Sequence, residues 1–181
     1  MSLITSLIAG LLGVLIGALL TPLFTALWQR RNWQRHEAMK SYAKLFADGV
    51  SEVSVCSVLY DAICTGNEDM IKMAHQELPG LINSPLMRLV SQCWLLEKDN
   101  GIRSKIEKIK NDYKECRIGL LARHETWELS KKRGHIGEPQ NKQLEKMIKR
   151  NIKEYESAPK PGEVLDLLEE LKEAVAKKYF R

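Results

Sequence analysis

One uncharged stretch, from Leu3 to Trp28, constrains this chain more than any other feature of its sequence. Its 26 residues include no Asp, Glu, Lys, Arg or His. As a helix rising about 1.5 Å per residue it would be roughly 39 Å long, and the hydrocarbon core of a bilayer is about 30 Å thick. A cleaved signal peptide, the main alternative, would have a basic start and a shorter apolar run. The stretch therefore predicts a single transmembrane helix within residues 1–29.

The residues that follow this stretch predict its orientation. Between Arg30 and Lys44 the chain has five Lys or Arg residues and one Glu. Because cytoplasmic flanks carry an excess of positive charge, we expect the N-terminus outside and residues 30–181 in the cytoplasm. Arg30, Arg31 and Arg35 would form a basic collar at the lipid surface. This flank supplies most of the net charge of +5, so the charge indicates contact with lipid head groups.

Small side chains recur along one face of the expected membrane helix. Helical spacing places them on the same side, and small residues allow helices to approach closely in lipid. The pattern predicts self-association of this helix, although a monomeric anchor would also tolerate it. The residues are Ser6, Gly10, Gly13, Gly17 and Thr21.

The remaining residues, 30–181, read as one all-α domain, an up-and-down helical bundle. Apolar residues recur at helical spacing over 36–64, 102–130, 141–156 and 163–179, and shorter helices are expected after Asn67 and after Ser84-Pro85. Asp99-Asn100-Gly101 reads as a turn. Four scattered cysteines, with no metal-ligand spacing, predict free thiols. We expect no metal and no cofactor, because phosphate-loop, nucleophile-elbow and zinc signatures are absent from the sequence.

Charge is segregated in the last third of the sequence. Residues 131–153 have eight basic and two acidic side chains, whereas residues 154–173 have seven acidic and two basic ones. Three interpretations fit this pattern. The two helix faces could neutralise each other, they could dock between neighbouring subunits, or residues 131–133 could contact RNA.

Arg117 and His124 form the one pattern that suggests chemistry. They lie seven residues apart, two helical turns, and so share a helix face. There a histidine could move the proton of a ribose hydroxyl and an arginine could hold the phosphate. This R-x6-H arrangement resembles the motif of the HEPN ribonuclease superfamily, with Ile118 standing where those families usually have a polar residue. The resemblance implies a helical bundle and a composite, metal-independent endoribonuclease site at a dimer interface. A structural histidine packed in the bundle is the alternative.

One membrane helix, a helical bundle and a degenerate R-x6-H pattern at Arg117 and His124 together resemble the small membrane accessory proteins of type VI-B CRISPR loci. That resemblance implies a homo-oligomeric ring with a central pore in the inner membrane. It also implies a functional link to an RNA-guided, RNA-cutting effector nuclease whose antiviral defence the accessory strengthens. Two alternatives are a membrane-tethered HEPN ribonuclease and a non-conducting anchor that recruits a cytoplasmic partner.

Overall fold

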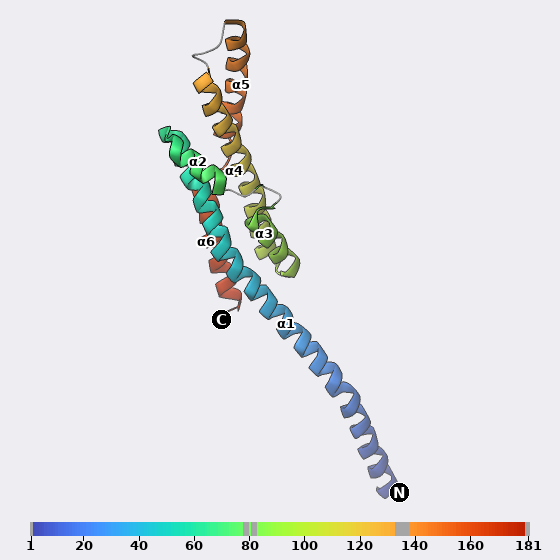
Figure 1. Ribbon diagram of the computed structural model, residues 1–181. Helices are drawn as coiled ribbons and strands as arrows, with labels where there is room; N and C mark the ends of the chain where they lie inside the picture. Colours follow the sequence, from blue (N-terminus) through green and yellow to red (C-terminus); the bar gives the residue numbers. More distant parts are fainter. Residues whose placement is uncertain (1, 78–79, 81–82, 133–137, 180–181) are drawn as a thin grey trace. The chain divides into compact units, whose positions relative to one another are not determined.

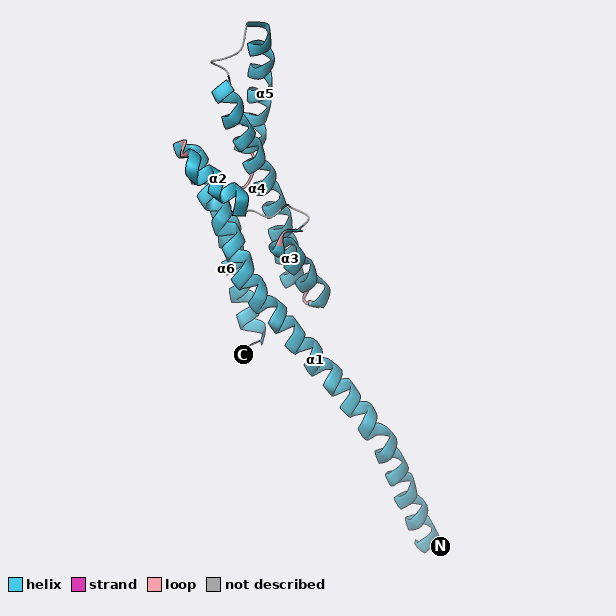
Figure 2. Cartoon of the chain, viewed as in Figure 1, coloured by secondary structure: helices cyan, strands magenta, loops and turns pink. Residues whose placement is uncertain are grey.

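The computed structural model describes the backbone of residues 2–77, 80, 83–132 and 138–179, and the side chains of residues 22–179 with gaps at 23, 75, 78–79, 81–82, 133–141 and 154. Over these residues the chain forms six α-helices and no strand (Figures 1 and 2). The expected all-α fold with a helical bundle is therefore confirmed. The helices are α1 (Ser2–Thr65), α2 (Glu68–Glu77), α3 (Pro85–Leu96), α4 (Asn100–Lys132), α5 (Glu138–Glu156) and α6 (Pro161–Tyr179).

The chain divides into two compact units, Met1–Met39 and Lys40–Arg181. The first is the N-terminal part of α1, which is assigned as one helix from Ser2 to Thr65. Among the side chains that the structure describes, no helix is long and apolar enough to cross a membrane. Most of the predicted span, residues 3–21 and 23, lies outside those described side chains, and so do Ser6, Gly10, Gly13, Gly17 and Thr21.

The ends of α1 and α2 follow the local sequence signals. Gly66 has a φ of 70°, a left-handed conformation that glycine adopts without a steric penalty. Its N–H donates to Ile63 O at 3.3 Å, and Asn67 N–H donates to Ala62 O at 3.0 Å. These two bonds satisfy carbonyl groups at the end of a helix. Asn67 then caps α2, because its side-chain oxygen accepts from Met70 N at 3.2 Å.

The expected turn at Asp99-Asn100-Gly101 is wrong, because α4 begins there. Asp99 Oδ1 accepts hydrogen bonds from Gly101 N at 2.8 Å and from Ile102 N at 3.0 Å. An aspartate that satisfies the first free amides of a helix is an N-cap. By contrast, the start expected at Ser84-Pro85 is confirmed, since Ser84 caps α3 by accepting from Met87 N at 3.1 Å and Pro85 is its first residue.

Helix α4 is the centre of the second unit, and α3, α5 and α6 all pack against it (Figure 1). Helix α5 lies along the later part of α4, where Asn151 donates to Glu125 at 3.2 Å. Helix α6 lies along the earlier part, where Lys105 and Glu170 form an ion pair at 2.8 Å. The two C-terminal helices therefore follow one another along α4.

The core of this unit contains the apolar residues that helical spacing predicted. It also contains two acidic residues that the sequence did not lead us to expect in the core. Tyr42, Leu45, Val53 and Cys56 of α1 are buried, as are the residues that α4 turns inward. Glu52 and Glu97 are equally buried. The buried side chains of α4 that pack there include Ile102, Ile106, Ile109, Tyr113, Cys116 and Leu120.

Candidate functional site

Arg117, one of the two predicted site residues, lies inside the bundle. Its side chain is 8 % exposed, and its guanidinium Nη1 lies 3.4 Å from Oε1 of Glu52, which is 4 % exposed. The same nitrogen donates to the hydroxyl oxygen of Tyr113 at 3.0 Å, and that hydroxyl donates to Glu52. A buried charge needs an opposite charge and hydrogen bonds to offset its lost hydration, and Glu52 and Tyr113 supply both.

The Glu52 carboxylate also joins three helices. It projects from α1, receives Tyr113 and Arg117 from α4, and accepts from Leu86 N at 2.9 Å in the first turn of α3. The first amides of a helix have no partner within the helix, and the helix dipole favours a negative charge there. Glu52 therefore stabilises both Arg117 and the start of α3.

Groups around this ion pair have shifted pKa values. Burial raises the pKa of the Cys56 thiol to about 11, against a smaller lowering by Arg117. Burial also raises the pKa of Tyr113, with Cys56 and the bond to Glu52 adding to the effect. The thiol and the phenol therefore stay neutral at physiological pH, and the charges here are those of Glu52 and Arg117.

His124, the other predicted site residue, lies in a different environment. It is partly exposed, and its ring stacks on Trp127 with a centroid distance of 6.0 Å and an angle of 25°. Lys131 lies 3.7 Å from the centre of the same Trp127 ring and forms an ion pair with Glu68 of α2 at 2.5 Å. His124 thus belongs to a surface cluster near the end of α4, whereas the charge of Arg117 faces the interior.

The predicted basic collar lies on the first unit, in the part of α1 whose side chains are described. Arg30, Arg31 and Arg35 are all exposed. Trp28 and Trp33 beside them are 65 % and 62 % exposed. Large apolar rings next to arginines are typical of a water–lipid interface, where tryptophan is enriched.

A second buried carboxylate, Glu97, ties the C-terminus to the centre of the bundle. It accepts from Tyr42 of α1 at 2.8 Å, from Asp99 N at 2.8 Å and from the ammonium group of Lys178 in α6. Burial by itself would raise the pKa of Glu97. The bond from Lys178 and those from the backbone amides and Tyr42 outweigh it and hold this pKa below its ordinary value.

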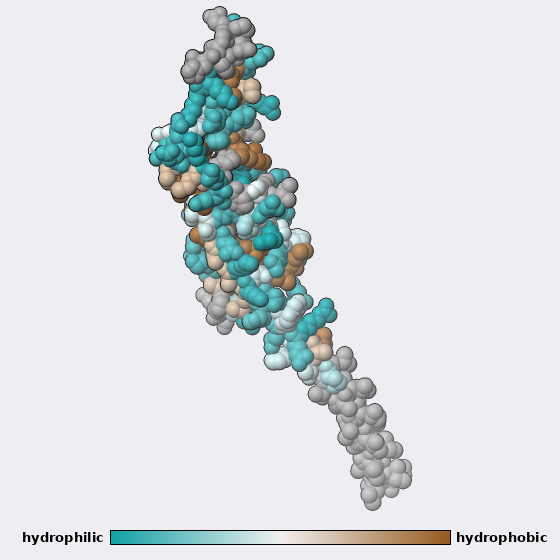
Figure 3. Space-filling model, in the orientation of Figure 1, coloured by the Kyte–Doolittle hydropathy of each residue, from teal (hydrophilic) through white to brown (hydrophobic). Residues whose placement is uncertain are grey.

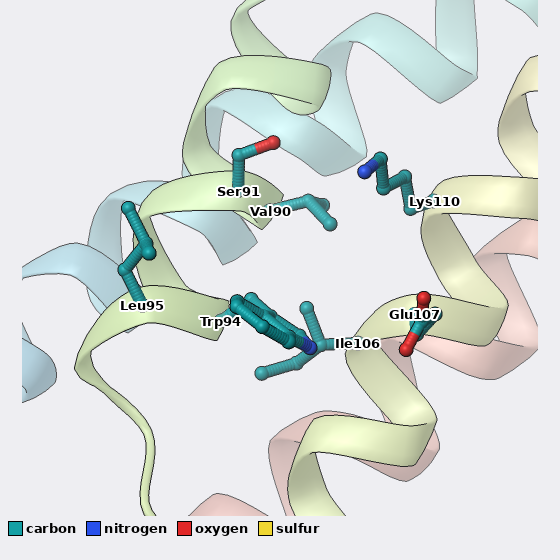
Figure 4. Close-up of a pocket in the computed structure, with 7 residues that line it drawn as sticks. All are labelled: Val90, Ser91, Trp94, Leu95, Ile106, Glu107 and Lys110. Atoms are coloured by element: carbon teal, nitrogen blue, oxygen red, sulfur yellow. The ribbon is translucent and has the colours of Figure 1, made fainter.

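Helices α3 and α4 enclose a surface pocket of about 310 Å³, close to the lower limit for small-ligand sites. Its lining is Val90, Ser91, Trp94 and Leu95 of α3 with Ile106, Glu107 and Lys110 of α4. In Figure 4 the side chains of Ser91 and Lys110 point toward one another above the Trp94 ring, which lies beside Ile106. The Arg103 guanidinium lies 4.7 Å from the centre of the same Trp94 ring. The pocket thus has an apolar floor and a polar rim.

Glu52, Glu97 and the α3–α4 pocket were not predicted from the sequence. Glu52 did carry a signal, since it follows Gly49 by three residues and precedes Cys56 by four, on the buried stripe of α1. Among the described residues no group of His, Cys, Asp or Glu side chains could hold a metal ion. Comparison with known protein families, with curated proteins and with solved structures finds no match to this chain. Its function must therefore be inferred from its own residues.

Proposed function

We propose that this protein is a single-pass protein of a bacterial inner membrane that self-associates through its N-terminal helix into a ring-shaped pore. The observation that carries the proposal is the uncharged stretch Leu3–Trp28, followed at once by the exposed arginines Arg30, Arg31 and Arg35. One helix cannot conduct, so a pore needs several copies. An apolar wall without charged rings would open by wetting and would discriminate poorly among ions.

The role we propose for such a pore is antiviral defence beside an RNA-guided CRISPR effector nuclease. This part rests on the resemblance to the accessory proteins of type VI-B loci. The HEPN-like character of the bundle belongs to the same proposal. Two observations support it: the R-x6-H spacing of Arg117 and His124, and the all-helical second unit.

The first experiment measures the detergent-corrected mass of the solubilised full chain by light scattering, and then ion flux through liposomes that contain it. We expect a closed assembly of several copies that conducts. Replacing Gly13 and Gly17 by Leu should dissolve it, because larger side chains keep the helices apart. Ala18→Leu, next to Gly17 in the sequence but about 100° around the helix from it, is the matched control. A monomer without flux would overturn the proposal.

A non-conducting anchor that recruits a partner is the second candidate, and the α3–α4 pocket favours it. Trp94 and Leu95 at this pocket are 38 % and 72 % exposed, and tryptophan is enriched among the residues that anchor interfaces. The two candidates differ in whether the particular sequence of residues 3–28 matters. An unrelated apolar helix in place of residues 3–28 should preserve an anchor and should abolish a pore, whereas Trp94→Ala should impair only the anchor.

A further inference from the structure

Lysines on the outer face of α5 form a stripe of one sign. Lys146, Lys149 and Lys153 are exposed and lie opposite Leu144 and Ile148, the side of α5 that faces inward. None of the three forms an ion pair with any residue whose side chain is described. We call these three residues the α5 cationic stripe. Like charges on one helix face repel each other, and an oppositely charged partner would relieve that repulsion.

Helix α6 has the complementary surface. Asp166, Glu169 and Glu173 are exposed and lie opposite the buried residues Val164 and Leu171. We call these three acidic residues the α6 anionic stripe. Within α6, Glu169 also forms an exposed ion pair with Lys172 at 3.0 Å. Both stripes have the same spacing, i, i+3 and i+7, so each extends about 10 Å along its helix. Equal length and opposite sign make them matching surfaces.

The two stripes of one chain are too far apart to neutralise each other. Helix α5 contacts α4 at Glu125 and α6 contacts it at Lys105. These α4 positions are 20 residues apart, which corresponds to about 30 Å of helix. Exposed charges beyond about 10 Å are largely screened at 0.1 M salt. Figure 1 shows α5 and α6 at successive levels along α4, and Figure 3 shows that hydrophilic side chains cover much of the visible face of the second unit.

We propose that the α5 cationic stripe docks on the α6 anionic stripe of a second copy of this chain. In this contact α5 of one copy meets α6 of the next, so the interface is head-to-tail, the kind of interface that closes into a ring. The inference deepens the proposed self-association, since it names a contact between bundles in addition to the contact between membrane helices.

Charge reversal on the full chain tests this docking. The α5 variant is Lys146→Glu, Lys149→Glu and Lys153→Glu, and the α6 variant is Asp166→Lys, Glu169→Lys and Glu173→Lys. Either one should weaken association of the bundles roughly ten-fold or more, because three favourable pairs become repulsive at every contact between copies. The two sets combined in one chain should restore association, and so should an equal mixture of the two variants.

Energy transfer between fluorophores on the exposed Cys64 would report association of the bundles in liposomes of zwitterionic lipid, since the other three cysteines are buried. Arg88→Glu, Lys108→Glu and Lys114→Glu make the control, with the same change in net charge at exposed positions off the stripe. Circular dichroism would verify that each variant is folded. We expect transfer to fall in both single-stripe variants, to fall in the wild type at high salt, and to stay unchanged in the control.

Two results would overturn the docking. In the first, energy transfer falls in the α5 variant and the added α6 reversal does not restore it. That result would assign the α5 cationic stripe to an anionic partner such as RNA or a lipid head group. In the second, all variants keep wild-type transfer. In either case Gly13→Leu with Gly17→Leu separately decides the proposed assembly of the membrane helix, so the two failures can be told apart.

Discussion

The buried pair of Arg117 and Glu52 leads to the most specific prediction of this structure. Arg117→Met keeps the length of the side chain and removes its charge, which leaves the carboxylate of Glu52 buried without a cation. Removing one partner of a buried ion pair costs about 3–5 kcal/mol. Since a domain is typically stable by about 5–15 kcal/mol, we expect the bundle of this variant to be marginal.

The partner variant is Glu52→Gln. Its amide oxygen can still accept from Leu86 N, a bond of 2.9 Å in the wild type, so the start of α3 keeps its cap while the negative charge is lost. Arg117 is then the unpaired charge, and the expected cost is of similar size. The double variant buries neither charge. Its loss of unfolding free energy should therefore be about 2–3 kcal/mol smaller than the sum of the losses of the two single variants, at the upper end of couplings between contacting residues.

Urea unfolding of the full chain, followed by far-ultraviolet circular dichroism in a non-ionic detergent, measures these three free energies of unfolding. The control is His124→Ala, at a partly exposed position, which should cost less than about 1 kcal/mol. A cost below about 1 kcal/mol for Arg117→Met, or costs of the two single variants that simply add, would refute the reasoning. Either result would mean that Arg117 does not stabilise the bundle through Glu52, and a functional role would then explain its position better.

Three further predictions concern the bundle. Gly119→Ala should destabilise it by about 1–3 kcal/mol in the same urea assay, because a Cβ there would lie 2.5 Å from Ala158 Cβ, whereas Gly162→Ala meets nothing within 4 Å and should be tolerated. Ser84→Ala removes the cap of α3 and should cost about 1 kcal/mol, with Ser84→Asp as the variant that rescues it. The folded-state pKa of Glu97 is lowered from 4.5, so its stabilising effect is present above pH 4.5 and is lost as pH falls through the folded value. Thermal unfolding between pH 6 and pH 3 should show that loss, and Glu97→Gln should flatten it.

Local signals in the sequence predicted most of the helices. Apolar periodicity placed the helical segments, Gly66 marked the end of α1, and Ser84-Pro85 marked the start of α3. Each of these signals acts within a few residues, where sequence patterns carry their information. Asp99 was misread for a related reason, since Asp-Asn-Gly is equally typical of a turn and of a helix start, and only the bonds to the amides of α4 distinguish them.

The buried carboxylates could not be predicted from local patterns, because their partners are distant in the chain. Glu52 lies 65 residues from Arg117, and Glu97 lies 81 residues from Lys178. Whether a charged residue on an apolar stripe faces the core depends on a partner that the helix itself does not contain. The same applies to Arg117, whose spacing from His124 suggested a shared site while its partner Glu52 lay on another helix.

The environment of Arg117 also bears on the choice between a pore and a ribonuclease. A phosphate that reached the guanidinium would have to displace Glu52 and leave that carboxylate buried and unpaired, at about 3–5 kcal/mol. That cost corresponds to a roughly hundred- to several-thousand-fold loss of occupancy. A nuclease built on Arg117 and His124 would therefore need a rearrangement that opens the core between α1 and α4. The proposed self-association through the N-terminal helix and the charged stripes needs no such opening, because Lys149 and Asp166 are already at the surface.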